Sequence, residues 1–179
     1  MTTQPEPQCH VLITRDEIAA TVSRLAGEIR RDYLGKYPLL IGVLKGSFMF
    51  LADLVRQLNL PLEIDFIGVS SYGAGKDSSG KATIAGVLRS QVKGREVLVV
   101  EDIVDSGLTT SFLLDELRKK KPASLRLCAL ADKVSRRRLP VTIDYRGFTV
   151  PDKFLVGYGL DLGERFRYLP DICYVEEKE

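Results

Sequence analysis

The feature that most constrains the fold is an alternation between short strands that are apolar on both faces and amphipathic helices. The run LLIGVL at 39–44 is apolar at consecutive positions, which suits a strand covered by helices on both sides. Similar runs lie at 62–69, 96–100 and 125–130. Helical patterns occur at 14–33, 47–58 and 112–117. The alternation predicts an α/β fold, with a twisted, mainly parallel sheet flanked by helices and joined by right-handed crossovers.

The two ends of the chain carry weaker patterns than its centre. Residues 1–10 are polar and contain two prolines, so we expect a frayed start. The C-terminal part alternates turns with short β-like pieces at 141–143, 154–158 and 172–175. The length of 179 residues and the lack of a linker predict one domain spanning 1–179.

Composition excludes several classes of protein. Lys and Arg number 26 against 24 for Asp and Glu, so a net charge of +2 gives no strong field to attract nucleic acid or an anionic membrane. Three widely spaced cysteines without a C-x-x-C pair argue against a disulfide framework and a zinc site. Charges interrupt every apolar stretch, and the start lacks the pattern of a signal peptide. We therefore expect a cytoplasmic protein without a nucleic-acid or membrane partner.

The segment most informative about chemistry is EVLVVEDIVDSGLTT at 96–110. A buried strand leads into Glu101 and Asp102, and we expect a loop over 101–109 followed by a helix. Residues 105–109 can offer backbone N–H groups, two hydroxyls and a helix N-terminus to an anion, and Gly107 allows close approach. Carboxylates would repel a phosphate but can accept hydrogen bonds from a sugar. The segment suggests a sugar-phosphate site, although so short a motif also fits solvated acids and an ordinary helix cap.

Two common nucleotide signatures are missing from the chain. The stretch GKDS at 75–78 lacks the spacing of a P-loop, and GYG at 157–159 lacks the third glycine and the strand–helix context of a dinucleotide site. ATP hydrolysis and hydride transfer are therefore disfavoured.

The segment VLVVEDIVDSGLT at 97–109 resembles the 5-phosphoribosyl 1-pyrophosphate (PRPP) signature of type I phosphoribosyltransferases. Four further segments resemble the hypoxanthine-guanine (6-oxopurine) members of that family, in the same order along the chain. They are LLIGVLKGSFMF (39–50), SSYG (70–73), ALADKV (129–134) and VPDKFLVGYGLDLGERFR (150–167).

The resemblance implies the type I phosphoribosyltransferase fold, with a core of about 36–150 and a small hood built from about 1–35 and 151–179. It also implies transfer of the 5-phosphoribosyl group from PRPP to N9 of hypoxanthine and/or guanine, which gives IMP or GMP and pyrophosphate. Mg²⁺ would be the cofactor in this purine-salvage reaction. Members of the family commonly form homodimers or homotetramers.

The resemblance also assigns roles around the ribose and its phosphate. Glu101 and Asp102 would hold the ribose hydroxyls and contribute to a metal site, and Asp105 would be the catalytic proton acceptor for the purine. A bare sequence would also allow Asp105 to be a helix cap. The 5′-phosphate would be bound at Ser106, Gly107, Leu108 and Thr109, with Leu108 contributing only its backbone N–H.

For pyrophosphate, the resemblance points to Lys45, Gly46 and Arg167. An arginine fork suits this ligand because it can donate two parallel hydrogen bonds to an anion. The family also suggests a cis Leu44–Lys45 peptide bond, which is rare for a residue other than proline.

For the purine, the resemblance points to Lys133 at the 6-oxo group, Phe154 stacked on the ring, and Leu155 with Asp161 near the base. Asp161 would also coordinate Mg²⁺. A lysine cation donates to a carbonyl but repels the amino group of adenine. In isolation, a lysine after a strand is usually a solvated charge, and Phe154 in a β-like segment is usually core.

The flexible stretch SYGAGKDSSGK at 71–81 would form a lid that begins at Ser71 and Tyr72 and excludes water from the reaction. The run Arg136-Arg137-Arg138 is typical of a solvated face, although it could also attract phosphates.

Two other functions compete with this interpretation. One is a nucleotide-sensing regulator on the same fold that binds RNA, which a broad basic face would indicate. The other is a phosphoribosyltransferase for another base, such as xanthine, adenine or a pyrimidine. Residues of the base site, and not the fold, separate these functions.

Overall fold

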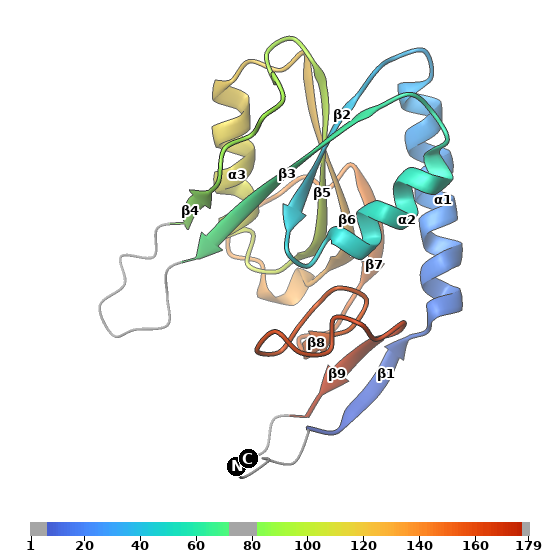
Figure 1. Ribbon diagram of the computed structural model, residues 1–179. Coiled ribbons are helices and arrows are strands. Elements are labelled where there is room, and N and C mark those ends of the chain that lie inside the picture. Colours follow the sequence, from blue (N-terminus) through green and yellow to red (C-terminus); the bar gives the residue numbers. More distant parts are fainter. Residues whose placement is uncertain (1–6, 72–81, 177–179) are drawn as a thin grey trace.

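The computed structural model describes residues 7–71 and 82–176, which form a large sheet and a small one (Figure 1). The large sheet has the strand order β4-β3-β2-β5-β6-β7, and the small one has the order β1-β9-β8. From β3 to β7 all neighbouring strands are parallel, and only β4 at the edge is antiparallel. The predicted α/β class with a mainly parallel sheet is confirmed.

The strands of the large sheet are β2 (Leu39–Leu44), β3 (Glu63–Ser71), β4 (Ala82–Ala85), β5 (Glu96–Val104), β6 (Ser124–Asp132) and β7 (Tyr145–Thr149). The small sheet contains β1 (Cys9–Ile13), β8 (Phe154–Val156) and β9 (Ile172–Val175). The helices are α1 (Arg15–Tyr33), α2 (Phe48–Leu58), α3 (Leu108–Lys119) and the short 3₁₀ helix η1 (Val134–Arg136).

Helix α1 begins with a capping box. The Thr14 side chain accepts a hydrogen bond from the backbone N–H of Glu17, and the Glu17 carboxylate accepts one from the backbone N–H of Thr14 at 2.8 Å. These reciprocal bonds satisfy N–H groups that have no partner inside the helix. Hydrogen bonds from Thr14 hold the pKa of Glu17 below its usual value.

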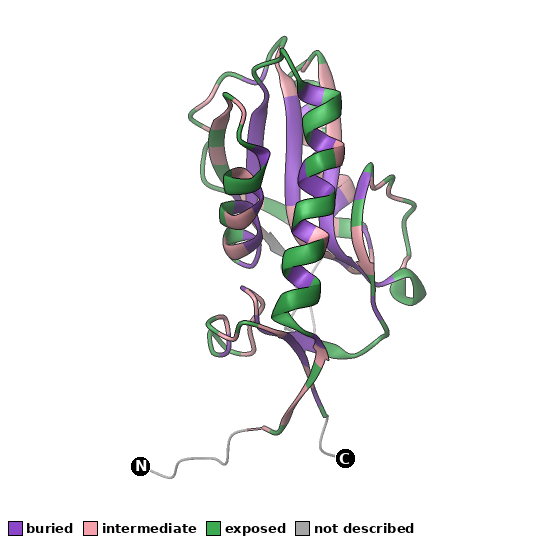
Figure 2. Cartoon of the chain, turned by 90° about the vertical axis from the view of Figure 1, so that its right-hand side faces the viewer, coloured by how far each residue is buried: buried purple, intermediate pink, exposed green. Residues whose placement is uncertain are grey.

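Two apolar layers cover the two faces of the large sheet. Strand β5 shows the division: Leu98 and Val100 pack with α1 and α2, whereas Val97 and Val99 pack with α3. Successive side chains of a strand point to opposite faces, so a run that is apolar at every position serves both layers. Figure 2 shows the buried strands behind α1, whose outward side is exposed.

The carboxyl ends of three neighbouring strands position the site. Strands β2, β5 and β6 are adjacent and parallel, so the residues that follow them, from Lys45, Asp105 and Lys133, meet at one edge of the sheet. The small sheet lies beyond this edge (Figure 1). The candidate site thus lies at the edge of the large sheet that faces the small sheet.

Three local expectations differ from the structure. The predicted loop at 101–109 is wrong in its first half, because β5 continues to Val104 through its pairing with β6. Of the start expected to be frayed, residues 1–6 lie outside the described chain, whereas Cys9 and His10 belong to β1 and pair with β9. The strand expected at 141–143 begins instead at Tyr145. Helix α1 packs on α2 and β7, and the division into a core and a hood remains a prediction.

Within the two described ranges, no helix combines the length and apolar character that crossing a membrane requires.

The layered core makes a direct prediction about stability. Leu98 is fully buried in β5, so Leu98→Ala should lower the free energy of unfolding by about 2–5 kcal/mol through lost burial and a residual cavity. Chemical denaturation monitored by circular dichroism measures this change. The control is Leu34→Ala, because Leu34 is 72% exposed after α1. Equal effects of the two substitutions would contradict the described core.

Candidate active site

The segment at 105–109, called the anion loop because its donors are predicted to bind an anion, is held in shape by its backbone. Gly107 precedes α3 with φ at 81°, and a Cβ atom at this position would lie 2.5 Å from the Leu139 carbonyl oxygen. The carbonyl oxygen of Ser106 accepts hydrogen bonds from the backbone N–H groups of Arg138 at 2.8 Å and Leu139 at 3.1 Å. Glycine is therefore required by both conformation and space. The first-turn N–H groups of a helix lack intrahelical acceptors, so the start of α3 can bind an anion.

Arg137 fastens this loop to the neighbouring strand. Its Nε donates to the carbonyl oxygen of Asp105 at 3.1 Å, and its Nη2 donates to that of Val104 at 3.4 Å. The same guanidinium forms an ion pair with Asp132, whose side chain is 3% exposed and which also pairs with Arg146 at 3.2 Å. From its sequence, the arginine run at 136–138 is predicted to form a solvated face. For Arg137 this prediction is wrong, because the side chain is largely buried against the loop.

The acid pair lies on β5 just past its pairing with β2. That pairing ends at Gly42 and Val100, which leaves Glu101 and Asp102 open on this side. Burial and the neighbouring Asp102 charge raise the pKa of Glu101 well above its usual value, and burial also raises the pKa of Asp102. Within the described ranges, neither carboxyl group forms an ion pair. A cation or a hydroxyl donor would stabilise their charged forms.

Mg²⁺ fits this set of oxygen donors, because it is usually bound by one or two carboxylates together with substrate phosphates. In the part of the chain that the structure describes, no three His, Cys, Asp or Glu residues form a complete metal site by themselves. The acids thus suit an ion that shares its ligands with a substrate.

Gly46 forms the wall opposite the acid pair. A Cβ atom at this position would overlap the Asp102 carboxylate, and a Cβ atom at Gly159 would overlap the Gly46 carbonyl oxygen. Gly46 therefore contacts the Asp102 side chain and the Gly159 backbone, which come from segments distant in sequence. The Leu44–Lys45 peptide bond that precedes Gly46 is cis, as expected.

Asp105 lies between two cations. Its Oδ2 is 3.6 Å from Nζ of Lys133, and its Oδ1 is 3.5 Å from Nε of Arg136. Oδ1 is buried and has no hydrogen-bond partner in the described chain, so it can accept a proton or a hydrogen bond from a ligand. Lys133 is buried, with its side chain 7% exposed, in contrast to a solvated lysine.

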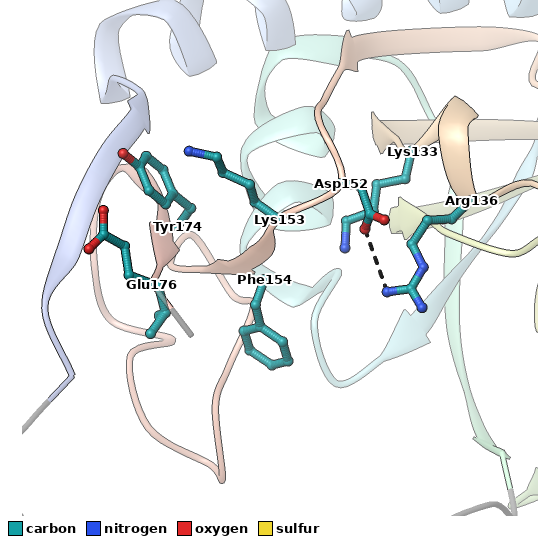
Figure 3. A pocket seen from close by; sticks show the side chains of 8 residues that line it. Lys133, Arg136, Asp152, Lys153, Phe154, Tyr174 and Glu176 are labelled. Carbon is teal, nitrogen blue, oxygen red and sulfur yellow. Dashed lines mark ion pairs between the residues drawn. The ribbon is translucent and has the colours of Figure 1, made fainter. Parts of the chain in front are cut away.

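A cavity of about 640 Å³ adjoins Lys133 and Arg136. Figure 3 shows these side chains on one side, with Asp152 paired to Arg136, and Phe154 on β8 nearby. Phe154 is 43% exposed, so it is not a core residue. Leu155 points into the core, which leaves only its backbone for a ligand. The cavity offers an aromatic ring and cations, which suits a planar polar heterocycle.

Arg167 anchors a second charged group, beside Gly159. Its Nη1 donates to the Gly159 carbonyl oxygen at 2.8 Å, and its Nη2 pairs with Asp161 at 2.8 Å and Glu164 at 3.2 Å. Its Nε is buried without a hydrogen-bond partner in the described chain. Lys45 joins the group through Glu164, at 2.9 Å.

Glu164 is a member of this group that the sequence analysis did not identify. Hydrogen bonds from Lys45 and Arg167 hold the pKa of Glu164 below its usual value. The sequence shows only that Glu164 lies three residues before Arg167, which does not by itself indicate an ion pair. Its contact with Lys45, 119 residues away, depends on the fold.

Comparisons with known proteins agree with this geometry. Residues 13–162 match the family model described as the phosphoribosyl transferase domain. The chain is 47% identical over 162 residues to the hypoxanthine-guanine phosphoribosyltransferase of Bacillus subtilis, covering 90% of both chains. The chain belongs to the hypoxanthine-guanine phosphoribosyltransferases.

Solved structures of this phosphoribosyltransferase family have the same fold. A hypoxanthine-guanine phosphoribosyltransferase from Bacillus anthracis, with HEPES in its active site, superposes with a TM-score of 0.89 at 43% identity, covering 96% of this chain and 100% of that one. The chain is also 47% identical to the bifunctional protein TilS/HprT of Listeria monocytogenes, of which it spans only 25%.

For this phosphoribosyltransferase chain, the expected lid lies mostly outside the described residues. Ser71 ends β3 opposite Ala82 of β4, and Tyr72 is not described. The lid remains a prediction.

The contact between Gly46 and Asp102 can be tested by adding one methyl group. Gly46→Ala should lower the free energy of unfolding by about 1–3 kcal/mol, because the new Cβ must displace the Asp102 carboxylate. Gly27→Ala is the matched control: the helical Gly27 has open space around its Cβ position, so stability should rise by about 0.5–1 kcal/mol. Thermal or urea unfolding compares them. An unaltered stability of Gly46→Ala would show that the contact does not exist.

Proposed function

We propose that this chain transfers the 5-phosphoribosyl group of PRPP to N9 of hypoxanthine or guanine, releasing pyrophosphate and forming IMP or GMP. The proposal depends on the buried Lys133, which lies 3.6 Å from Asp105 and lines a cavity together with Phe154. A purine between Lys133 and Phe154 would then lie beside a ribose whose phosphate is held at Gly107.

In the proposed reaction, N9 attacks the anomeric carbon as the bond from that carbon to the pyrophosphate oxygen breaks. Positive charge develops on the ribose, and the carboxylates of Glu101 and Asp102 would stabilise it and bind the hydroxyls. Asp105 would accept the ring proton of the purine, a role supported by its buried Oδ1. Ser106, Gly107, Leu108 and Thr109 would hold the 5′-phosphate, because the first turn of α3 presents backbone donors there.

Pyrophosphate would be held by Lys45, Gly46 and Arg167. The buried Nε of Arg167 supports this role, since a guanidinium donor without a partner can bind an anion. Mg²⁺ would be bound at the acid pair and at Asp161, which do not form one metal-binding cluster in the described structure, and when bound it would neutralise charge on the leaving pyrophosphate. Closure of a lid from Ser71 and Tyr72 would exclude water.

The base preference would come from Lys133, which can donate to the 6-oxo group shared by hypoxanthine and guanine but repels the amino group of adenine. Leu155 would contribute backbone groups close to the same base. Among the described residues, Lys133 pairs with Asp105, whose side chain is 42% exposed, at the long distance of 3.6 Å, so the ammonium group can also donate a hydrogen bond to the carbonyl.

Assembly into a homodimer or homotetramer is also proposed. Phe48, Ile64 and Phe66 are exposed apolar side chains, and Phe66 lies close to Leu51 of α2 across Gly42. Contact with a second copy would remove this apolar surface from water.

An assay of nucleotide formation tests the proposal directly. The protein is incubated with PRPP, Mg²⁺ and each free base, and Asp105→Asn should lower kcat by about 10²–10⁴-fold by removing the proton acceptor. Asp115→Asn on the outer side of α3 is the matched control, because Asp115 pairs only with the exposed Arg118 in the described chain. Undiminished kcat in Asp105→Asn would remove Asp105 from catalysis, and no nucleotide from the unmodified protein would overturn the proposed function.

Base selectivity provides a second test. Lys133→Met should reduce the ratio of kcat/KM for hypoxanthine to kcat/KM for adenine by about 10- to 100-fold, the value of a charged hydrogen bond. Lys153→Met is the control, since Lys153 lines the cavity over the Tyr174 ring but outside the Lys133–Asp105 pair. An unchanged ratio in Lys133→Met would show that another group reads the 6-position.

A further inference from the structure

The Glu164 carboxylate bridges two cations that the proposed function assigns to pyrophosphate. Its Oε1 lies 2.9 Å from Nζ of Lys45, and its Oε2 lies 3.2 Å from Nη2 of Arg167. Both oxygens of one carboxylate are thus used, and each binds a different cation. Pyrophosphate is also an anion with several oxygens, so it could bind the same two cations in place of this carboxylate.

Glu164 lies in a tight turn and adopts a backbone conformation that is unfavourable for a residue with a side chain. Leu162 and Arg165 exchange hydrogen bonds of 3.2 Å, and the two residues between them, Gly163 and Glu164, have φ of 58° and 66°. This is the geometry of a tight turn with left-handed central residues, where Asn and Gly are favoured. A glutamate in this conformation costs about 1–2 kcal/mol. The turn is further tied by the Glu164 N–H, which donates to Asp161 Oδ2 at 2.8 Å.

Strained residues of this kind are concentrated at functional sites, where their side chains have a task. The Glu164 side chain is 64% exposed, so burial of apolar surface does not explain its position. The remaining explanation in the described structure is its charge, which acts on Lys45 and Arg167.

We propose that Glu164 is an internal competitor for pyrophosphate: its carboxylate binds Lys45 and Arg167, and these contacts must open before both cations can bind the ligand. This inference rests on the proposed function. Glu164 is a positioning residue that touches the cations and not the reacting atoms. Its effect would be to weaken pyrophosphate binding and so to favour release of this product.

The partners of Glu164 determine how large the effect can be. Lys45 is as exposed as Glu164, which limits the strength of that pair, whereas the Arg167 side chain is only 19% exposed. Exposed ion pairs contribute little, and Arg167 also keeps its 2.8 Å pair with Asp161, so removal of the Glu164 charge should strengthen binding by a modest factor.

The experiment measures binding of pyrophosphate with Mg²⁺ by isothermal titration calorimetry at fixed pH and ionic strength. Glu164→Gln should lower Kd about two- to fivefold. Glu116→Gln is the matched control, since Glu116 also pairs with a lysine, Lys119 of α3, away from the site, and its Kd should equal that of the unmodified protein. Glu164→Asn provides a second variant that removes the charge and accepts the left-handed conformation, and it should also lower Kd.

A second measurement separates competition from a structural role. In a Lys45→Met background, Glu164→Gln should strengthen binding by a smaller factor, because one of the two cations for which Glu164 competes is gone. Unchanged or weaker binding in both Glu164 variants would overturn the inference while leaving the proposed function intact. If the unmodified protein bound no pyrophosphate and formed no nucleotide, the proposed function itself would fail.

Discussion

Parallel pairing of β2, β5 and β6 is the constraint on which the candidate site depends. The pairing places Lys45, Asp105 and Lys133 at one edge, although they are far apart in sequence. It also brings backbone close to carboxylate, since Gly46 faces Asp102 with no room for a side chain. In the observed register, Gly42 of β2 pairs with Val100 of β5, and Val100 pairs with Cys128 of β6. A slip of one residue would exchange the faces of every side chain and so disperse the site.

The cations at this edge have acidic partners within the chain, whereas the acid pair Glu101 and Asp102 forms no ion pair among the described residues. Lys133 and Arg136 face Asp105, and Lys45 and Arg167 face Glu164. Such pairs keep charged groups stable at a partly buried surface, yet each can exchange one internal partner for a ligand. By contrast, Arg137 binds the buried Asp132 and the loop backbone, and so it supports the site without facing a ligand.

Periodicity and local motifs predict a large part of this structure. Runs that are apolar on both faces predicted the sheet and its layers, and the segment around Gly107 predicted the turn that precedes α3, where anion binding is part of the proposed function. The end of β5 was missed because Glu101 and Asp102 have low strand propensity, while their pairing with β6 is a long-range interaction. The role of Arg137 also depends on long-range contacts, so the sequence of the arginine run does not distinguish a solvated side chain from one packed on a loop.

The most direct test of the account is a crystal structure of the protein with IMP. We expect the phosphorus atom beside Gly107, at the start of α3, and the 6-oxo group within hydrogen-bond distance of Lys133 Nζ, with the ring on Phe154. A phosphate bound elsewhere, or a base outside the cavity that Lys133 and Phe154 line, would contradict the central claim that this edge of the sheet is a phosphoribosyl-transfer site.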